Sequence, residues 1–158
     1  MVPPPMVCEK VQAPGLAAGG MVDARTPLAA FALGAEGIQM GTRMVSAAES
    51  PVHQNWKNAI FAAQETDTVF LNRFGPGPAL RALRTDKTTR FEKEPPENVM
   101  GEFRNALALY FGGDMEASIA LSGQVAGRID GIKTVKEIIA ETVMEFEETV
   151  ASLGKKYA

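Results

Sequence analysis

Residues 14–43 read PGLAAGGMVDARTPLAAFALGAEGIQMGTR, and this stretch decides the fold. Residues 14–18 form a short apolar run that ends at Gly19-Gly20, which is typical of a buried strand followed by a tight turn. Residues 37–40 form a second short run, and Gly41-Thr42-Arg43 follows it at once. The stretch therefore predicts two short strands that each end in a glycine turn.

A helix is predicted between the two strands. Asp23 is interpreted as its N-cap rather than as a ligand, and Leu28 and Phe31 fall on one apolar face. Gly34 is expected to end the helix after Leu33, because glycine adopts the left-handed conformation at a helix C-terminus without steric cost. The order of strand, helix and strand indicates a parallel βαβ unit and an α/β fold.

The remainder of the chain predicts mainly helices. Helices are expected at 6–11, at 50–63 with Pro51 at the first position, at 102–111, at 115–127 and at 134–153. A short helix is also expected at 79–84, with Arg81 and Arg84 on one side. The segments between them are predicted to be an extended segment at 67–71, a turn at 74–78 and a mobile charged loop at 87–97. Thr134 and Glu137 form a capping box for this last helix. Its apolar stripe consists of Val135, Ile138, Ile139, Val143, Phe146 and Val150.

These elements suggest two domains, with residues 1–50 carrying the parallel strands and residues 51–158 forming a helical subdomain. Two adjacent parallel strands need further strands beside them and helices on both faces. A complete (β/α)₈ barrel takes about 200 residues or more, so a chain of 158 residues is too short for one. We therefore expect the sequence to be the end of a larger fold.

Composition excludes several classes of protein. With 46% hydrophobic and 22% charged residues, the chain is typical of a soluble globular domain, and we expect it in the cytoplasm. No apolar run approaches the roughly 18 residues of a membrane helix, and we expect no secretory signal, because the first residues carry no basic and apolar regions of that kind. A net charge of -3 argues against nucleic acid as a partner. The sequence has one cysteine, Cys8, and one histidine, His53, which argues against a metal site. We expect Cys8 to be a small buried side chain and His53 to be an exposed helix residue.

The two glycine turns are the candidate site. Glycines directly after a parallel strand let backbone N–H groups approach a phosphate closely, and Thr42 adds a hydroxyl donor. Either turn alone is more often plain turn geometry, but two in the correct order and spacing favour a phosphate ligand. Arg43 could assist phosphate binding or form a surface ion pair, and both alternatives stay open. No arrangement of side chains indicates a catalytic group.

The sequence resembles the nitronate monooxygenase family, formerly called 2-nitropropane dioxygenases, and shares the same pattern with the flavin-dependent enoyl-acyl-carrier-protein reductases. The resemblance covers nearly the whole chain in order. The segments that carry it are residues 17–20, 33–43 and 75–83, Gly113-Asp114, Gly123-Gln124, Ala126-Gly127 and residues 134–139. Three segments depart from the family pattern: Pro3-Pro4-Pro5 is richer in proline, Gly15-Leu16 replaces β-branched residues, and Arg128 occupies a position that is usually apolar.

The resemblance implies the C-terminal part of a TIM barrel that binds FMN, followed by a mainly helical subdomain that covers the flavin. Gly19, Gly20, Gly41 and Thr42 would then hold the FMN phosphate. The stretch Leu121-Ser122-Gly123-Gln124 would approach the isoalloxazine ring and a small-molecule substrate. The implied reaction is the oxidation of an alkyl nitronate with oxygen.

The family's catalytic histidine belongs to a glycine-rich motif upstream of the phosphate turns, and nothing in this sequence matches it. We therefore expect the chain to correspond to the C-terminal half only, with no catalytic residue of its own and no activity in isolation. Two alternatives are an FMN-dependent enoyl reductase and a non-catalytic fragment that binds flavin or phosphate. The unpaired strands call for either a homodimer or the missing N-terminal half.

Overall fold

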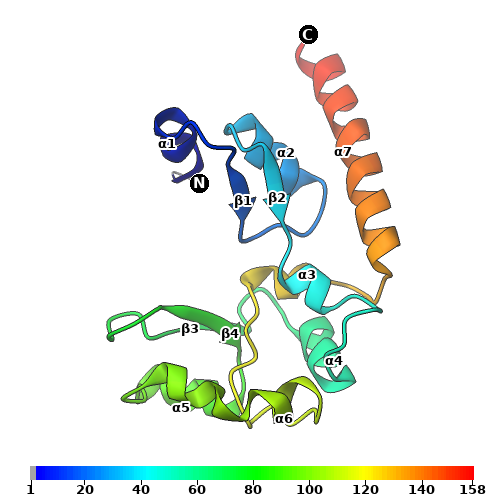
Figure 1. The fold of residues 1–158 in the computed structure, drawn as a ribbon. Helices are drawn as coiled ribbons and strands as arrows, with labels where there is room; N and C mark the ends of the chain where they lie inside the picture. The colour runs from blue at the N-terminus through cyan, green and yellow to red at the C-terminus, as the bar shows by residue number, and fades with distance from the viewer. Residues whose placement is uncertain (1–2) are drawn as a thin grey trace.

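The structure, a computed structural model, describes residues 3–158. Its first unit begins with helix α1 (Pro3–Lys10), which starts earlier than residues 6–11. Strand β1 (Leu16–Ala18), helix α2 (Arg25–Ala32) and strand β2 (Gly37–Gln39) follow in order. The two strands pair in parallel, with Leu16 opposite Gly37 and Ala18 opposite Gln39. The predicted βαβ unit is confirmed (Figure 1).

Glycine conformations end the elements of this unit as expected. Gly19 and Gly20 have φ values of +82° and +81°, which lets the chain turn sharply after β1. Gly34 has a φ of +94° and follows α2. Asp23 bonds the first helical amide through Oδ1, which accepts from the N–H of Arg25, although Ala24 occupies the N-cap position.

Helix α7 (Val135–Tyr157) returns to this unit and packs beside α2, where Phe146 meets Phe31 edge to face with ring centroids 5.5 Å apart. The predicted Thr134–Glu137 capping box is present. The helix continues past residue 153 to Tyr157, and its last turn carries Lys155 and Lys156, which suit the negative end of the helix dipole.

A second group of elements lies between β2 and α7 in the sequence, and it is drawn below the parallel strands in Figure 1. They are α3 (Thr42–Val45), α4 (Gln54–Ala62), β3 (Thr68–Leu71), β4 (Leu80–Leu83), α5 (Asp86–Lys93), the 3₁₀ helix η1 (Val99–Asn105), α6 (Ala106–Tyr110) and the 3₁₀ helix η2 (Gln124–Arg128). The chain is therefore mixed α/β, with few strands and several helices.

The predicted helix at 79–84 is wrong, because these residues form β4 in an antiparallel hairpin with β3. Cross-strand contacts account for the difference. Arg81 lies over the ring of Phe70, and its Nη1 donates to Thr68 Oγ1 at 3.0 Å. Arg84 instead pairs with Glu92 of α5. The two arginines therefore do not share a helix face.

The predictions for residues 87–97 and 115–127 are also wrong. Residues 86–93 form α5, because Thr85 and Thr88 cap each other's backbone N–H groups in a capping box. In the second segment only η2 is helical, and Leu121 instead forms a bridge with Ala82 of β4. Pairing along β4 thus satisfies backbone groups that the sequence alone assigned to a helix.

The start predicted for the helix at residues 50–63 is wrong as well. Helix α4 begins at Gln54, so Pro51 is not its first residue. His53 is the N-cap, half-buried rather than exposed, and its Nδ1 accepts from the N–H of Asn55 at 3.1 Å. A ring nitrogen does here what a hydroxyl or carboxylate usually does at a helix N-terminus.

Three small clusters form the core. Trp56 and Ile60 of α4 lie in the largest, with Leu109. The other two are Val69, Leu71, Ala82, Val99 and Ile119 at the hairpin, and Met21, Ala30 and Ala35 beside the parallel strands. Cys8 is half-buried rather than fully buried. Among residues 3–158, no helix is long and apolar enough to cross a membrane.

The apolar stripe of α7 is covered only in part. Ile138 is 2% exposed, but Ile139 is 52% exposed, and Val143 and Val150 are exposed as well. Neighbouring isoleucines on one helix therefore differ in burial, which makes them a matched pair for measuring what α7 contributes to stability.

We expect Ile138→Ala to lower the free energy of unfolding by about 2–5 kcal/mol, because it leaves a cavity against the fold. Ile139→Ala should change the same quantity by less than about 1 kcal/mol, since its side chain is half in solvent. Urea denaturation followed by circular dichroism measures both. Equal losses for the two variants would show that α7 does not dock through the Ile138 face.

Candidate functional site

A cavity of about 270 Å³ lies where β1 and β2 end. Parallel strands bring their carboxyl ends to the same edge of a sheet, so the turns that follow them become neighbours. The residues that line the cavity are Ala18, Gly19, Gly20, Met21, Gln39, Gly41, Thr42, Gly123 and Val125. The structure thus brings the two predicted glycine turns together, and adds one residue of the predicted pocket stretch at 121–124.

The backbone of the two turns is open to this cavity. A Cβ built at Gly19, Gly20 or Gly41 would have no other atom within 4 Å. Within residues 3–158, the N–H groups of Gly20, Gly41 and Thr42 donate to no acceptor. Free amides beside open space form a cradle that can receive an anion.

Thr42 connects the cradle to the rest of the chain. It is 9% exposed, and its Oγ1 accepts a hydrogen bond from the N–H of Gly123 at 2.8 Å. A hydroxyl both donates and accepts, so the proton of Thr42 remains able to donate to a ligand. The same side chain can therefore hold a ligand on one side and Gly123 on the other.

The other residues of the 121–124 stretch lie outside the cavity lining. Leu121 pairs with Ala82 of the hairpin, and Ser122 is buried, with its Oγ accepting from Trp56 Nε1 at 3.3 Å. Gln124 is exposed at the start of η2. Of the four, only Gly123 lines this cavity.

Sequence reasoning missed Ala18, Met21, Gln39 and Val125 as lining residues. Their side chains are small, apolar or uncharged, so nothing in their type marks them as part of a site. Ala18 and Gln39 could have been found from their positions, because each is the last residue of its strand.

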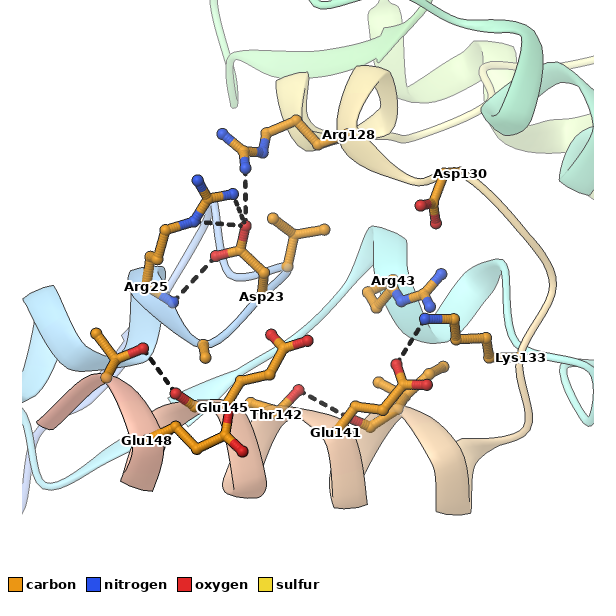
Figure 2. A pocket seen from close by; sticks show the side chains of 14 residues that line it. Asp23, Arg25, Arg43, Arg128, Asp130, Lys133, Glu141, Thr142, Glu145 and Glu148 are labelled. Carbon is orange, nitrogen blue, oxygen red and sulfur yellow. Dashed lines mark hydrogen bonds and ion pairs between the residues drawn. The ribbon is translucent and has the colours of Figure 1, made fainter. Parts of the chain in front are cut away.

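A larger cavity of about 520 Å³ lies between α2, α3, α7 and the segment that leads from η2 into α7. Figure 2 shows its charged lining. The Asp23 carboxylate accepts from both Arg25 and Arg128, and Lys133 pairs with Glu141. Among the described residues, five of the nine charged lining residues are paired in this way, whereas Arg43, Asp130, Glu145 and Glu148 form no ion pair.

Arg43 lies in this charged cavity and does not line the glycine cradle. It is 5% exposed, and its Nη1 donates to the carbonyl oxygen of Gly131 at 3.1 Å. Burial lowers the pKa of the guanidinium, although the charges of Asp130 and Glu141 act in the opposite direction. Among the described residues it forms no ion pair within 4.0 Å, so it is not a surface ion pair.

No acid–base side chain of residues 3–158 lines the cradle. His53 does not line it, and its backbone N–H donates to the carbonyl oxygen of Tyr110. Within the part of the chain that the structure describes, no three histidine, cysteine or carboxylate groups gather closely enough to hold a metal ion. The cradle thus offers binding groups from the backbone and one hydroxyl.

These features define an α/β protein in which two glycine turns enclose a cavity with free backbone amides. Residues 4–145 match the sequence pattern of the nitronate monooxygenase family, and the chain belongs to that family.

Three known proteins similar to this chain are all longer than it. A probable nitronate monooxygenase of Staphylococcus saprophyticus is 36% identical over 107 residues, which are 65% of this chain and 30% of that protein. FabK from Thermotoga maritima is 40% identical, with a TM-score of 0.88 over 98% of this chain and 51% of its own. Nitroalkane oxidase from Streptomyces ansochromogenes shares the fold, with 22% identity and a TM-score of 0.78, over 95% of this chain and 44% of its own. The chain therefore spans about a third to a half of the length of these proteins.

The Asp23 carboxylate gives the charged cavity a predictable pH dependence. Partial burial would raise its pKa, but the hydrogen bond and charge of Arg25, together with the charge of Arg128, lower it below its ordinary value. A lowered pKa in the folded state means that the carboxylate stabilises the fold above its ordinary pKa and that this contribution is lost as the pH falls through the lowered value.

Asp23→Asn should therefore lower the free energy of unfolding at neutral pH, with a difference from the parent chain that shrinks as the pH falls from about 5 to below 3.8. Urea denaturation at a series of pH values measures this difference. A difference that stays constant across the series would mean that the ion pairs of Asp23 do not stabilise the fold.

Proposed function

We propose that this chain supplies the FMN phosphate site of a flavin-dependent oxidoreductase of the nitronate monooxygenase type. The observation that carries the proposal is the meeting of both glycine turns with Gly123 in one cavity lined by free amides. The cavity suits a phosphate group, because a phosphate needs several N–H or O–H donors and a backbone that can approach it closely. Family membership supports a flavin as the group that carries this phosphate.

The N–H groups of Gly20, Gly41 and Thr42 would donate to the phosphate oxygens, together with the Thr42 hydroxyl. Gly123, held by Thr42, would form the wall of the cavity on the side of the isoalloxazine ring and the substrate. The flavin supplies the redox chemistry when bound, and the protein positions it. The substrate class in this proposal is an alkyl nitronate, oxidised with oxygen.

In this proposal the base for substrate proton transfer belongs to a segment outside residues 3–158, because the histidine motif of the family has no match in this sequence. No histidine or carboxylate of residues 3–158 lines the phosphate cradle. We therefore propose that the isolated chain does not turn over nitronates. Residues 1–50 would be the end of a TIM barrel, and residues 51–158 the subdomain that covers the flavin, with α7 returning to the barrel beside α2.

Gly41→Ala is a direct probe of the phosphate site. Gly41 has ordinary negative φ, and a Cβ there meets no atom, so the fold should tolerate alanine while the methyl group enters the cradle. We expect FMN to bind at least about tenfold more weakly, because charged hydrogen bonds to the phosphate lengthen or are lost. Gly154→Ala in α7 is the matched control, also free of clashes and outside the cradle.

Flavin absorbance and fluorescence titrations with FMN and with riboflavin make this test specific. Riboflavin lacks the phosphate, so its affinity should be lower in the parent chain and unaffected by Gly41→Ala. Equal affinity for FMN and riboflavin in a chain shown to be folded by circular dichroism would contradict the proposed phosphate site.

We propose further that the N-terminal half of the barrel covers the open side of β1. An apolar cavity of about 390 Å³ lies there, lined by Val7, Cys8, Gly15, Leu16, Ala17, Ala18, Gly19, Met21, Ala30 and Ala35. Leu16 is 70% exposed, and the exposed apolar stripe of α7 lies on the same βαβ unit. Unpaired strand edges and apolar faces favour association with further strands.

Co-expression of this chain with the N-terminal half of the S. saprophyticus relative should therefore give a co-purifying complex. Leu16→Asp should reduce co-purification strongly, because it places a charge on the surface to be covered. Leu107→Asp, at an exposed position of α6 away from β1, is the control. A stable homodimer of this chain, seen by size exclusion with light scattering and not displaced by the other half, would favour a second copy instead.

One other activity, enoyl reduction, is a candidate because the sequence resembles both groups of flavoenzymes and is 40% identical to FabK. Oxygen-dependent nitronate oxidation by the reconstituted complex supports the proposal, whereas NAD(P)H-dependent enoyl reduction would replace it. A complex that binds FMN and catalyses neither reaction would favour a non-catalytic flavin-binding module.

A further inference from the structure

The segment 123–131, here called the bridge segment, runs from the glycine cradle through η2 towards α7. Three long-range contacts tie it to residues that follow β1 and β2. The N–H of Gly123 donates to Thr42 Oγ1 at 2.8 Å, Arg128 Nη2 donates to Asp23 Oδ2 at 2.8 Å, and Arg43 Nη1 donates to the carbonyl oxygen of Gly131 at 3.1 Å. The bridge segment is thus held at its beginning, near its middle and at its end.

Each partner of the bridge segment belongs to one of the two turns. Asp23 comes three residues after Gly20, and Thr42 and Arg43 directly follow Gly41. The Asp23–Arg128 contact joins residues 105 positions apart, and it is the one that reaches the first turn. The bridge segment therefore has a hydrogen-bond partner beside each of the two turns.

The opposite side of the bridge segment is packed tightly. Ala126 is fully buried and Ile129 is 4% exposed, both in the cluster around Trp56. A Cβ added at Gly127 would lie 2.3 Å from the backbone nitrogen of Glu65. The packed side fixes one face, so the polar contacts to Asp23, Thr42 and Arg43 determine how the other face meets the turns.

We propose that Asp23 and Arg128 are a pair of positioning residues. They hold the bridge segment across the first glycine turn and thereby couple phosphate binding in the cradle to the position of the wall formed by Gly123 and Val125. This inference rests on the proposed function for the identity of the ligand. Figure 2 shows Arg25 and Arg128 converging on the Asp23 carboxylate.

Arg128 is the informative member of this pair, because it belongs to the bridge segment and reaches Asp23 across 105 positions of the sequence. Arg25 binds the same carboxylate but lies only two residues from Asp23, so it cannot connect distant segments. Coupling between two sites is reciprocal. Phosphate binding should therefore order the bridge segment, and loosening the bridge segment should weaken phosphate binding.

Hydrogen–deuterium exchange of the full chain tests the pair without reference to activity. Arg128→Met should increase amide exchange in residues 121–131 and leave α5 unchanged, whereas Arg25→Met should leave both unchanged. Arg128→Lys should restore part of the protection, since it keeps the charge. Added FMN should slow exchange in the same residues of the parent chain.

The binding readout uses FMN and riboflavin as probes. Arg128→Met should weaken FMN binding roughly two- to fivefold, the range for a partly exposed ion pair, and weaken riboflavin binding by a smaller factor, because riboflavin contacts the wall but has no phosphate in the cradle. Concentrated salt should bring the parent and the variant together, because salt screens the pair.

The outcomes separate this inference from the proposed function. A folded parent chain that binds neither FMN nor inorganic phosphate overturns the phosphate site, and with it the coupling. If FMN binds but Arg128→Met and Arg25→Met behave alike in exchange and affinity, the positioning pair is overturned and the phosphate site stands.

Discussion

The hydrogen bond from the Gly123 amide to the Thr42 hydroxyl oxygen joins parts of the chain that are 81 residues apart. It connects the second glycine turn directly to the stretch after the hairpin, and the contact of Arg43 with Gly131 holds the end of the same segment. With it, the open backbone of Gly41 and the start of η2 share one cavity. The constraint behind this geometry is the parallel pairing of β1 and β2, which sets both glycine turns at one edge.

The βαβ unit was predictable because its signals are local. Gly19, Gly20 and Gly34 adopt the positive φ values that their positions require, and no distant contact is needed to explain them. The hairpin was not predictable, because residues 80–83 become a strand only through pairing with β3 and with Leu121. Tertiary pairing overrode local preference there.

The same distinction applies to the candidate site. The glycine turns were identifiable from residue type, whereas Val125 and the Asp23–Arg128 pair arise from the return of a distant segment. Arg43 shows the limit most clearly, since the residue next to Thr42 points into a different cavity. Leu16 of β1 is exposed in the described chain, and the proposed N-terminal half would cover it.

Phosphorus NMR of FMN in the presence of this chain tests the central claim most directly, because it observes the phosphate itself. The account predicts that the phosphate signal shifts or broadens when flavin absorbance shows binding, and that Gly41→Ala abolishes this change. Bound flavin with an unperturbed phosphate signal would contradict the account, since the ring would then be held without the glycine cradle.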